Sequence, residues 1–88
     1  MDLAEFTTWS KRIADWSADY LRSLRDRPVR PRTAPGDVIA ALPVSPPEGA
    51  EPMARIFADF ERIVPGAMTH WQHPRFFAYF PANAAPAS

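Results

Sequence analysis

The residues of this chain that could do chemistry are concentrated between Pro65 and Asn83. Two histidines stand there three positions apart, His70 and His73. Two imidazoles at this spacing could share a metal ion on a turn, but protein zinc sites need three or four ligands. The segment has no cysteine and no third clear ligand, so we predict no metal site.

The same stretch is unusually rich in aromatic side chains. Five of the eleven residues from Trp71 to Pro81 are aromatic, and they show no strong helical or strand period. So many rings are unfavourable on a loop that faces only water, so they must either dock onto a surface or line a binding site. Docking is the simpler interpretation for about half of them, and we assign it to Phe76 and Phe77.

The rest of the chain offers no good candidate for a nucleophile in covalent catalysis. Lys11 is the only lysine, and it lies on the polar side of a predicted helix, where a Schiff-base role would need desolvation that the site does not offer. No serine has a nucleophile-elbow setting, and three scattered glycines cannot form a phosphate loop. We therefore predict that these 88 residues alone are inactive and contain no catalytic residue.

Composition narrows the class of protein further. Ten basic and ten acidic residues cancel, so nothing favours nucleic acid or an anionic membrane as a partner. Cysteine is absent, the N-terminus lacks the apolar core of a secretory signal, and no apolar run is long enough to span a bilayer. The expectation is a cytoplasmic chain that does not enter membranes.

The element that must support the aromatic stretch begins at the N-terminus. Within residues 1–27 we predict one amphipathic helix, capped by Asp2 with Glu5 completing a capping box. Large apolar residues recur every three or four positions, within an arc of about 80° on a helical wheel. This seam, narrow like a coiled-coil stripe, consists of Phe6, Trp9, Ile13, Trp16, Tyr20 and Leu24.

Residues 28–51 form a connector that is rich in proline. The prolines favour extended chain, and Asp37 could cap a short helix near residues 37–42 that Pro43 would end. Disorder is the compositional alternative for this stretch. The scattered apolar residues instead favour an ordered strap held against a surface.

A second amphipathic helix is predicted over residues 52–64, with Pro52 at its first position. The aromatic loop follows over residues 65–88, and the last residues resemble the entry to another helix. The apolar content exceeds what a chain of this length can bury, so we expect a partner surface and interpret the chain as a fragment.

Ordered motifs along the chain resemble one enzyme family. Thr69-His70-Trp71, then Pro74, then Phe76-Phe77-Ala78-Tyr79-Phe80-Pro81 is similar to the pattern P-G-V-T-H-W-x-x-P-x-F-F-A-Y-F-P of the group II pyridoxal-phosphate-dependent decarboxylases, the aromatic-L-amino-acid decarboxylase family. Tyr20-Leu21 and the proline-marked connector also match. The resemblance covers nearly the whole chain. One extra residue between Gly66 and Thr69 falls in a turn, where it is easily absorbed.

The resemblance implies a fold and a role. The chain would be the all-α N-terminal segment of a fold-type-I enzyme, with two long amphipathic helices, one short helix and an aromatic loop. Its first helix would embrace the second subunit of a homodimer, so the seam would be interface. Pyridoxal 5'-phosphate and its lysine would belong to a downstream domain that is missing here.

The resemblance also assigns one wall of the substrate pocket to Trp71, Tyr79, Phe80, Pro81 and Ala82. Flat rings would hold an aromatic or other L-amino acid and exclude water from the carboxylate that leaves. Several animal members of the family carry a residue with a hydroxyl group at the position of Ala82. Because this polar contact is absent here, the resemblance does not specify which amino acid is the substrate. The alternative from another class is a free-standing helical module that binds a partner or dimerises without catalysis.

Overall fold

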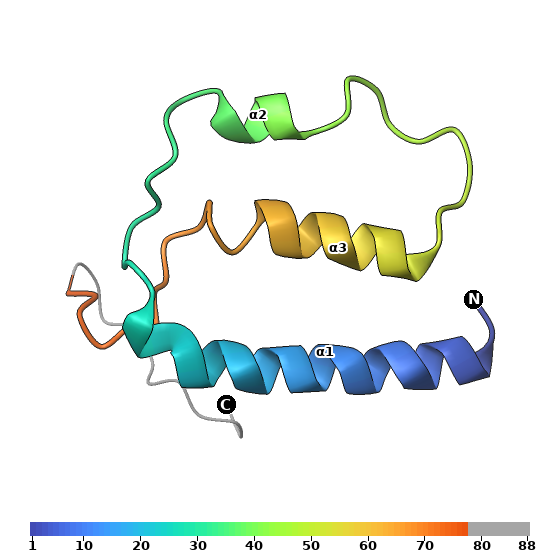
Figure 1. Cartoon of the computed structure of the whole chain (residues 1–88), viewed down its shortest axis with the longest axis horizontal. Coiled ribbons are helices and arrows are strands. Elements are labelled where there is room, and N and C mark those ends of the chain that lie inside the picture. Colours follow the sequence, from blue (N-terminus) through green and yellow to red (C-terminus); the bar gives the residue numbers. More distant parts are fainter. Residues whose placement is uncertain (78–88) are drawn as a thin grey trace. The chain divides into compact units, whose positions relative to one another are not determined.

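In the computed structural model, the structure describes residues 1–77. This part of the chain is helical and contains no strand, in agreement with the predicted all-α class (Figure 1). Its elements are α1 (Leu3–Ser23), a 3-10 helix η1 (Leu24–Asp26), α2 (Asp37–Ala41) and α3 (Met53–Ile63). None of the described helices is both long enough and apolar enough to cross a bilayer.

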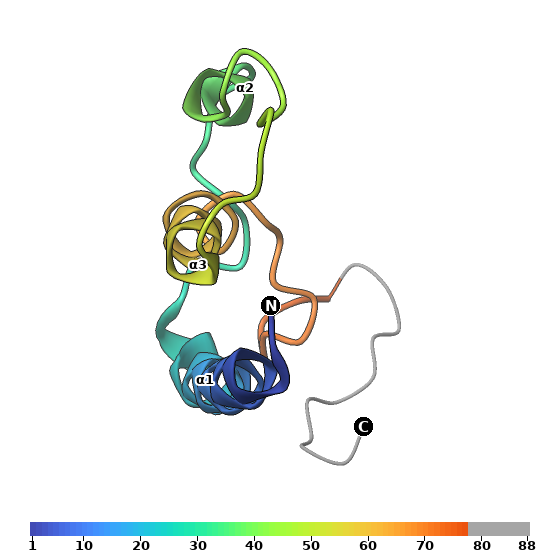
Figure 2. The ribbon, with the colours of Figure 1, turned by 90° about the vertical axis from the view of Figure 1, so that its right-hand side faces the viewer.

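The start of α1 follows the prediction from sequence. The Asp2 carboxylate accepts a hydrogen bond of 2.8 Å from the Glu5 amide, and the Glu5 carboxylate accepts one of 3.2 Å from the Asp2 amide. These two bonds form the expected capping box, which satisfies amides that a helix start leaves unpaired. Figure 2 shows α1 end-on, with the N-terminus at its near end.

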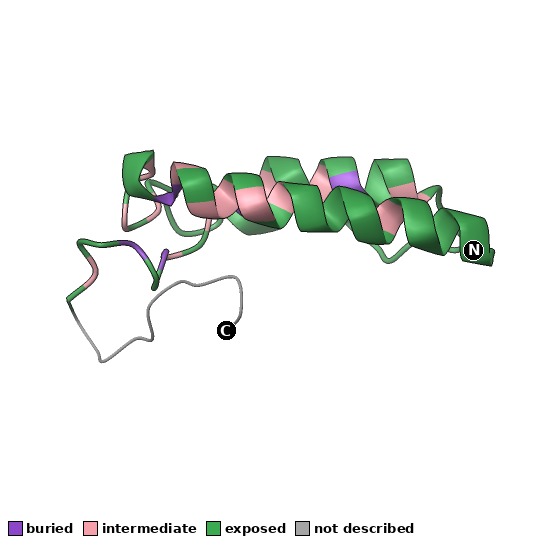
Figure 3. Ribbon diagram, turned by 90° about the horizontal axis from the view of Figure 1, so that it is seen from below, coloured by how far each residue is buried: buried purple, intermediate pink, exposed green. Residues whose placement is uncertain are grey.

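The end of α1 differs slightly from the expectation of one continuous helix within residues 1–27. Regular α-helix stops at Ser23, and Leu24 begins the tighter turn η1. Arg27 is already extended, as expected for a residue that precedes proline. The tighter turn places Leu24 in a buried position, whereas most of α1 is exposed (Figure 3).

The connector contains the short helix, but its cap is not the predicted one. Gly36 is the N-cap of α2, with a left-handed φ of 94°, and Asp37 is the first helical residue. The Asp37 carboxylate instead accepts a hydrogen bond of 2.7 Å from the Ala34 amide, which closes the preceding turn. Glycine is the residue that adopts this φ without strain, which explains why the cap moved one position back.

Helix α3 occupies the predicted region with one shift. Pro52 is the N-cap with an extended ψ of 140°, not the first helical residue. Phe57 is buried and stacks on Phe60, with ring centroids 5.8 Å apart. The C-cap Val64 precedes Pro65, whose ring stops the helix.

The chain divides into two compact units. One consists of Met1–Val29 and the chain from His70 onward, and the other is Arg30–Thr69. The first unit therefore joins α1 and η1 to residues that lie far along the sequence. It contains both histidines, His70 and His73, and the aromatic residue Trp71.

Candidate functional site

Residues 70–77, which we call the anchored loop, are built from two consecutive turns. The His70 amide donates to the Val29 carbonyl at 2.9 Å, the His73 amide to the His70 carbonyl at 3.0 Å, and the Phe76 amide to the His73 carbonyl at 3.0 Å. Bonds between residues three apart give a period of three residues per turn. Accordingly His70 and His73 are buried and Phe76 is half-buried, whereas the residues between them are exposed.

His70 connects the anchored loop to α1. Only 3% of its surface is exposed. Its Nδ1 lies 2.6 Å from the Tyr20 hydroxyl, and the two rings are tilted with centroids 5.5 Å apart. Such a short O–H···N bond between partly buried groups is a specific link between residues 50 positions apart.

His73 makes the second connection. It is 6% exposed, its Nε2 donates to the Arg25 carbonyl at 3.2 Å, and its Nδ1 accepts from the Arg75 amide at 3.0 Å. A neutral imidazole protonated on Nε2 satisfies both bonds at once. The H-x-x-H pair thus binds two different parts of the α1–η1 corner, and within residues 1–77 no cluster of three or more potential metal ligands occurs.

Tyr20 is surrounded by contacts from its own helix and from the residue that follows η1. Its ring stacks on Trp16, with centroids 5.5 Å apart and 13° between the planes, and the Arg27 guanidinium lies 5.1 Å from its centroid. Arg27 is held in turn, because its Nε donates to the Ser23 hydroxyl at 3.1 Å. Burial raises the pKa of Tyr20 above its ordinary value, although the charge of Arg27 opposes the rise.

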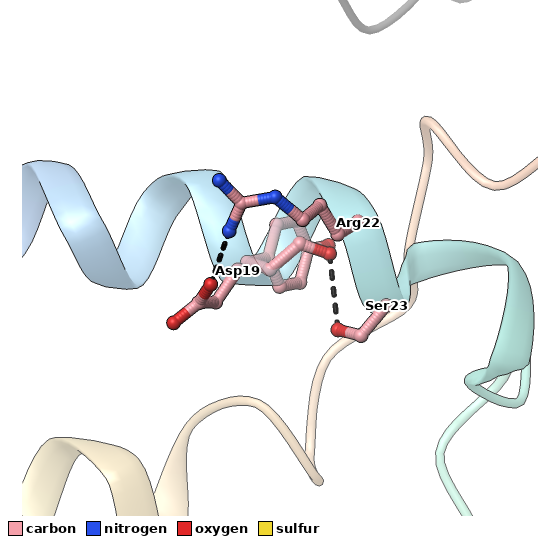
Figure 4. Close-up of polar contacts among 4 residues, drawn as sticks. Asp19, Arg22 and Ser23 are labelled. Carbon is pink, nitrogen blue, oxygen red and sulfur yellow. Dashed lines mark hydrogen bonds and ion pairs between the residues drawn. The ribbon is translucent and has the colours of Figure 1, made fainter.

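The polar edge of α1 beside Tyr20 is tied down locally. The Ser23 hydroxyl donates to the Tyr20 carbonyl at 3.1 Å, and Arg22 pairs with Asp19 on the exposed side (Figure 4). The exposed ion pair contributes little stability. The Ser23 bond matters more here, because it connects the backbone of Tyr20 to the residue that also holds Arg27.

Trp71 is the one predicted substrate-binding residue that the structure describes. It is 52% exposed and stacks on Phe76, with centroids 5.3 Å apart and 22° between the planes. Phe77, assigned to docking from sequence, is 85% exposed in this chain. The other predicted pocket residues, Tyr79, Phe80, Pro81 and Ala82, lie outside the described residues.

The predicted dimer seam is graded in exposure along α1. Phe6 is 59% exposed and Ile13 is also exposed, whereas Trp9, Trp16 and Tyr20 are half-buried and Leu24 is buried. An open hollow of about 550 Å³ lies beside the buried end. It is lined by Leu21, Arg22, Leu24, Arg25 and Asp26 and by the exposed residues Gln72 and Pro74. The seam is therefore most open near the N-terminus of the helix.

The described residues do not fit a site for pyridoxal phosphate. Lys11 is exposed on α1, so it is not enclosed in a pocket as a lysine that binds the cofactor would be. Both histidines already use ring nitrogens in contacts within this chain. Any such cofactor must be held by residues outside this part of the protein.

Comparison with known proteins identifies the family. The model of the pyridoxal-dependent decarboxylase conserved domain matches residues 35–88, which is more than half of the chain. The chain belongs to the pyridoxal-dependent decarboxylase family, as its motifs indicated. This assignment agrees with the all-helical architecture of the described residues.

Individual relatives align over nearly the whole chain. Aromatic-L-amino-acid decarboxylase of Manduca sexta is 42% identical over 88 residues, which are 99% of this chain and 17% of that protein. The crystal structure of Rhodiola rosea 4-hydroxyphenylacetaldehyde synthase superimposes with a TM-score of 0.86 at 41% identity, covering 99% of this chain and 19% of that one. The structure of Oryza sativa TDC with PLP gives a TM-score of 0.88 at 30% identity, covering 99% and 18%. The chain thus spans less than a fifth of the length of these relatives.

Sequence reasoning missed the pairing of Tyr20 with His70. It placed Tyr20 on the interface seam and considered His70 only as a metal ligand or as part of the family motif. The one available signal was that each is an aromatic residue with a polar tip in an apolar pattern, and such tips need a partner when buried. Nothing local in the sequence indicates that they are partners of each other.

Proposed function

We propose that this chain is the N-terminal segment of a pyridoxal-phosphate-dependent L-amino-acid decarboxylase. The observation that carries the proposal is the family match over residues 35–88. The alignment of the whole chain with a decarboxylase at 42% identity supports it. The cofactor and its lysine would lie in the remainder of the protein, and this segment would contribute to assembly and to the substrate pocket.

The first contribution is one wall of the pocket. Trp71 presents a large, half-exposed ring that is backed by Phe76. A stacked pair of rings offers a flat apolar surface to the side chain of an amino acid and keeps water away from the carboxylate. Tyr79, Phe80, Pro81 and Ala82 would continue this wall. The relatives named above differ in the activity that their names state, so we propose an aromatic or other L-amino acid without choosing one.

The second contribution is assembly of a homodimer. The N-terminal half of the seam leaves Phe6 and Ile13 exposed, and apolar residues in a row on one helix face are typical of surfaces that pack against a partner. A second copy of α1 or of the enzyme body would cover them. The cytoplasmic location stays a prediction from the sequence.

The experiment that tests the decarboxylase proposal uses the full-length protein. We expect borohydride reduction to add one pyridoxal-phosphate group per chain, detected by intact mass, and we expect the protein to release carbon dioxide from L-tryptophan or L-tyrosine. A protein that gains no adduct and releases no carbon dioxide would instead support the alternative, a helical module that binds a partner or dimerises without catalysis.

A further inference from the structure

We propose that Tyr20 and His70 form a latch that positions Trp71 for substrate binding, with His73 as a second anchor. The inference rests on the proposed function, because it takes Trp71 to be part of the pocket wall. It assigns to Tyr20 a role that is separate from the dimer seam on which it lies.

The anchored loop is a short segment of turns, so bonds to a regular element help to fix its orientation. The turns from His70 to Phe76 rest on two backbone hydrogen bonds, and one more joins His70 to Val29. Isolated turns of this kind do not hold a fixed orientation in water. The side chains of His70 and His73 add restraint, because they form hydrogen bonds with Tyr20 on α1 and Arg25 on η1.

The latch lies next to Trp71, the residue that we propose contacts the substrate. Trp71 directly follows His70, and its ring packs on Phe76, which lies one turn beyond His73. Trp71 is thus flanked by the two anchors along the chain. A displaced loop would present the Trp71 ring less well to the substrate side chain, so small movements of this loop should weaken substrate binding.

The ring of Tyr20 and its hydroxyl contact different partners, so the two can be tested separately. The ring is held by Trp16 and by Arg27, and neither contact uses the hydroxyl. Tyr20→Phe therefore removes the bond to His70 while the packing of the ring stays in place. Ser17→Ala is a matched control, because it deletes a hydroxyl three residues away that bonds only the Ile13 carbonyl on the same helix.

Hydrogen exchange of the full-length protein tests the latch itself. In Tyr20→Phe we expect the peptide covering residues 70–77 to exchange about tenfold faster, the effect of losing one partly buried hydrogen bond. Peptides from α3 should exchange at the wild-type rate, and Ser17→Ala should match wild type throughout. Unchanged exchange at residues 70–77 would overturn the latch.

Steady-state kinetics with L-tryptophan and L-tyrosine test the positioning role. A wall that contacts the substrate side chain equally before and during the reaction affects binding, so we expect KM to rise about tenfold in Tyr20→Phe with kcat within about twofold of wild type. The cofactor content and the dimer dissociation constant should not change. His70→Ala should also raise KM. His70→Asn keeps a polar atom near the place of Nδ1, so its KM should lie between those of His70→Ala and wild type.

The two proposals fail in different ways. Faster exchange at residues 70–77 with unchanged KM would overturn the positioning role while the decarboxylase assignment stands. A wild-type protein without cofactor adduct or carbon dioxide release would overturn the proposed function and the positioning role together. In that case the exchange measurement would still decide whether Tyr20 holds the loop.

Discussion

At the scale of single residues, the first unit depends on polar groups that are buried in pairs. His70, His73 and Tyr20 each place a polar atom among aromatic or backbone neighbours, and each of these atoms has a partner. In residues 1–77 no buried side-chain nitrogen or oxygen lacks a hydrogen bond. Such pairs add little net stability when complete but are costly to break, because the remaining partner stays buried and unsatisfied.

The alkaline titration of Tyr20 follows from its burial. The folded protein holds the phenolic proton more tightly than the unfolded chain does, because the pKa is raised above its ordinary value of 10.0. The contribution of Tyr20 to stability is therefore complete below about pH 10 and is lost as the pH rises through the raised pKa. We expect the difference in tyrosinate absorbance between wild type and Tyr20→Phe to reach its midpoint above pH 10. A midpoint at or below that value would contradict the burial of the hydroxyl.

The second anchor gives a prediction of its own. His73→Ala removes the donor to the Arg25 carbonyl and the acceptor for the Arg75 amide. Leaving such groups without partners costs about 1–3 kcal/mol. We expect hydrogen exchange over residues 70–77 to accelerate by a factor of about 5 to 150, since 1.36 kcal/mol corresponds to a factor of ten. The exposed neighbour Gln72, changed to Ala, is the control, and an equal effect of the two variants would refute a specific role of His73.

At the scale of elements, α1 is defined by signals at its two ends. The capping box fixes its start, and the approach to Pro28 converts its last residues into η1 and then into extended chain. This C-terminal corner brings Arg25 and Arg27 to the places where they contact His73 and Tyr20. The way the helix ends therefore decides where the anchored loop can bind.

The start of α1 can be tested independently of the corner. Asp2→Ala removes the side chain that caps the Glu5 amide, a change that costs about 1 kcal/mol. We expect the first turn of α1 to exchange its amide hydrogens roughly fivefold faster in the full-length protein, with little change over residues 70–77. Asp15→Ala, on the exposed middle of the same helix, provides the control. An equal acceleration in Asp15→Ala would show that the loss of charge, not of the cap, is responsible.

At the scale of the whole molecule, the first unit is assembled from distant parts of the sequence. Residues 30–69 form a unit of their own, and the chain then returns to bind Val29 through His70. The entropic cost of closing such a loop grows only slowly with its length, so a few specific bonds can hold its ends together. The N-terminal part of α1 remains exposed and is the surface that we propose for the second subunit.

The homodimer proposal is best tested at that exposed end. Phe6→Ala combined with Ile13→Ala removes apolar side chains that take no part in the latch, and burying each such side chain contributes about 1.5–3 kcal/mol. We expect the dimer dissociation constant of the full-length protein to rise at least about tenfold in sedimentation velocity experiments. Val44→Ser, at an exposed position in the connector, should leave it unchanged. If the double variant also dissociates like wild type, the seam is not an interface.

The sequence by itself determined the elements of this protein and its family. Helical periodicity, the capping box, the prolines and the aromatic motif are local patterns, and local patterns act through nearest neighbours along the chain. Two helix starts differ from the prediction by one position: Gly36 caps α2 in place of Asp37, and Pro52 caps α3 instead of being its first residue. Only the tertiary structure decided which distant residues meet. The bond between Tyr20 and His70 and the one between His73 and Arg25 join positions about fifty residues apart, and no periodicity or spacing specifies such a pair.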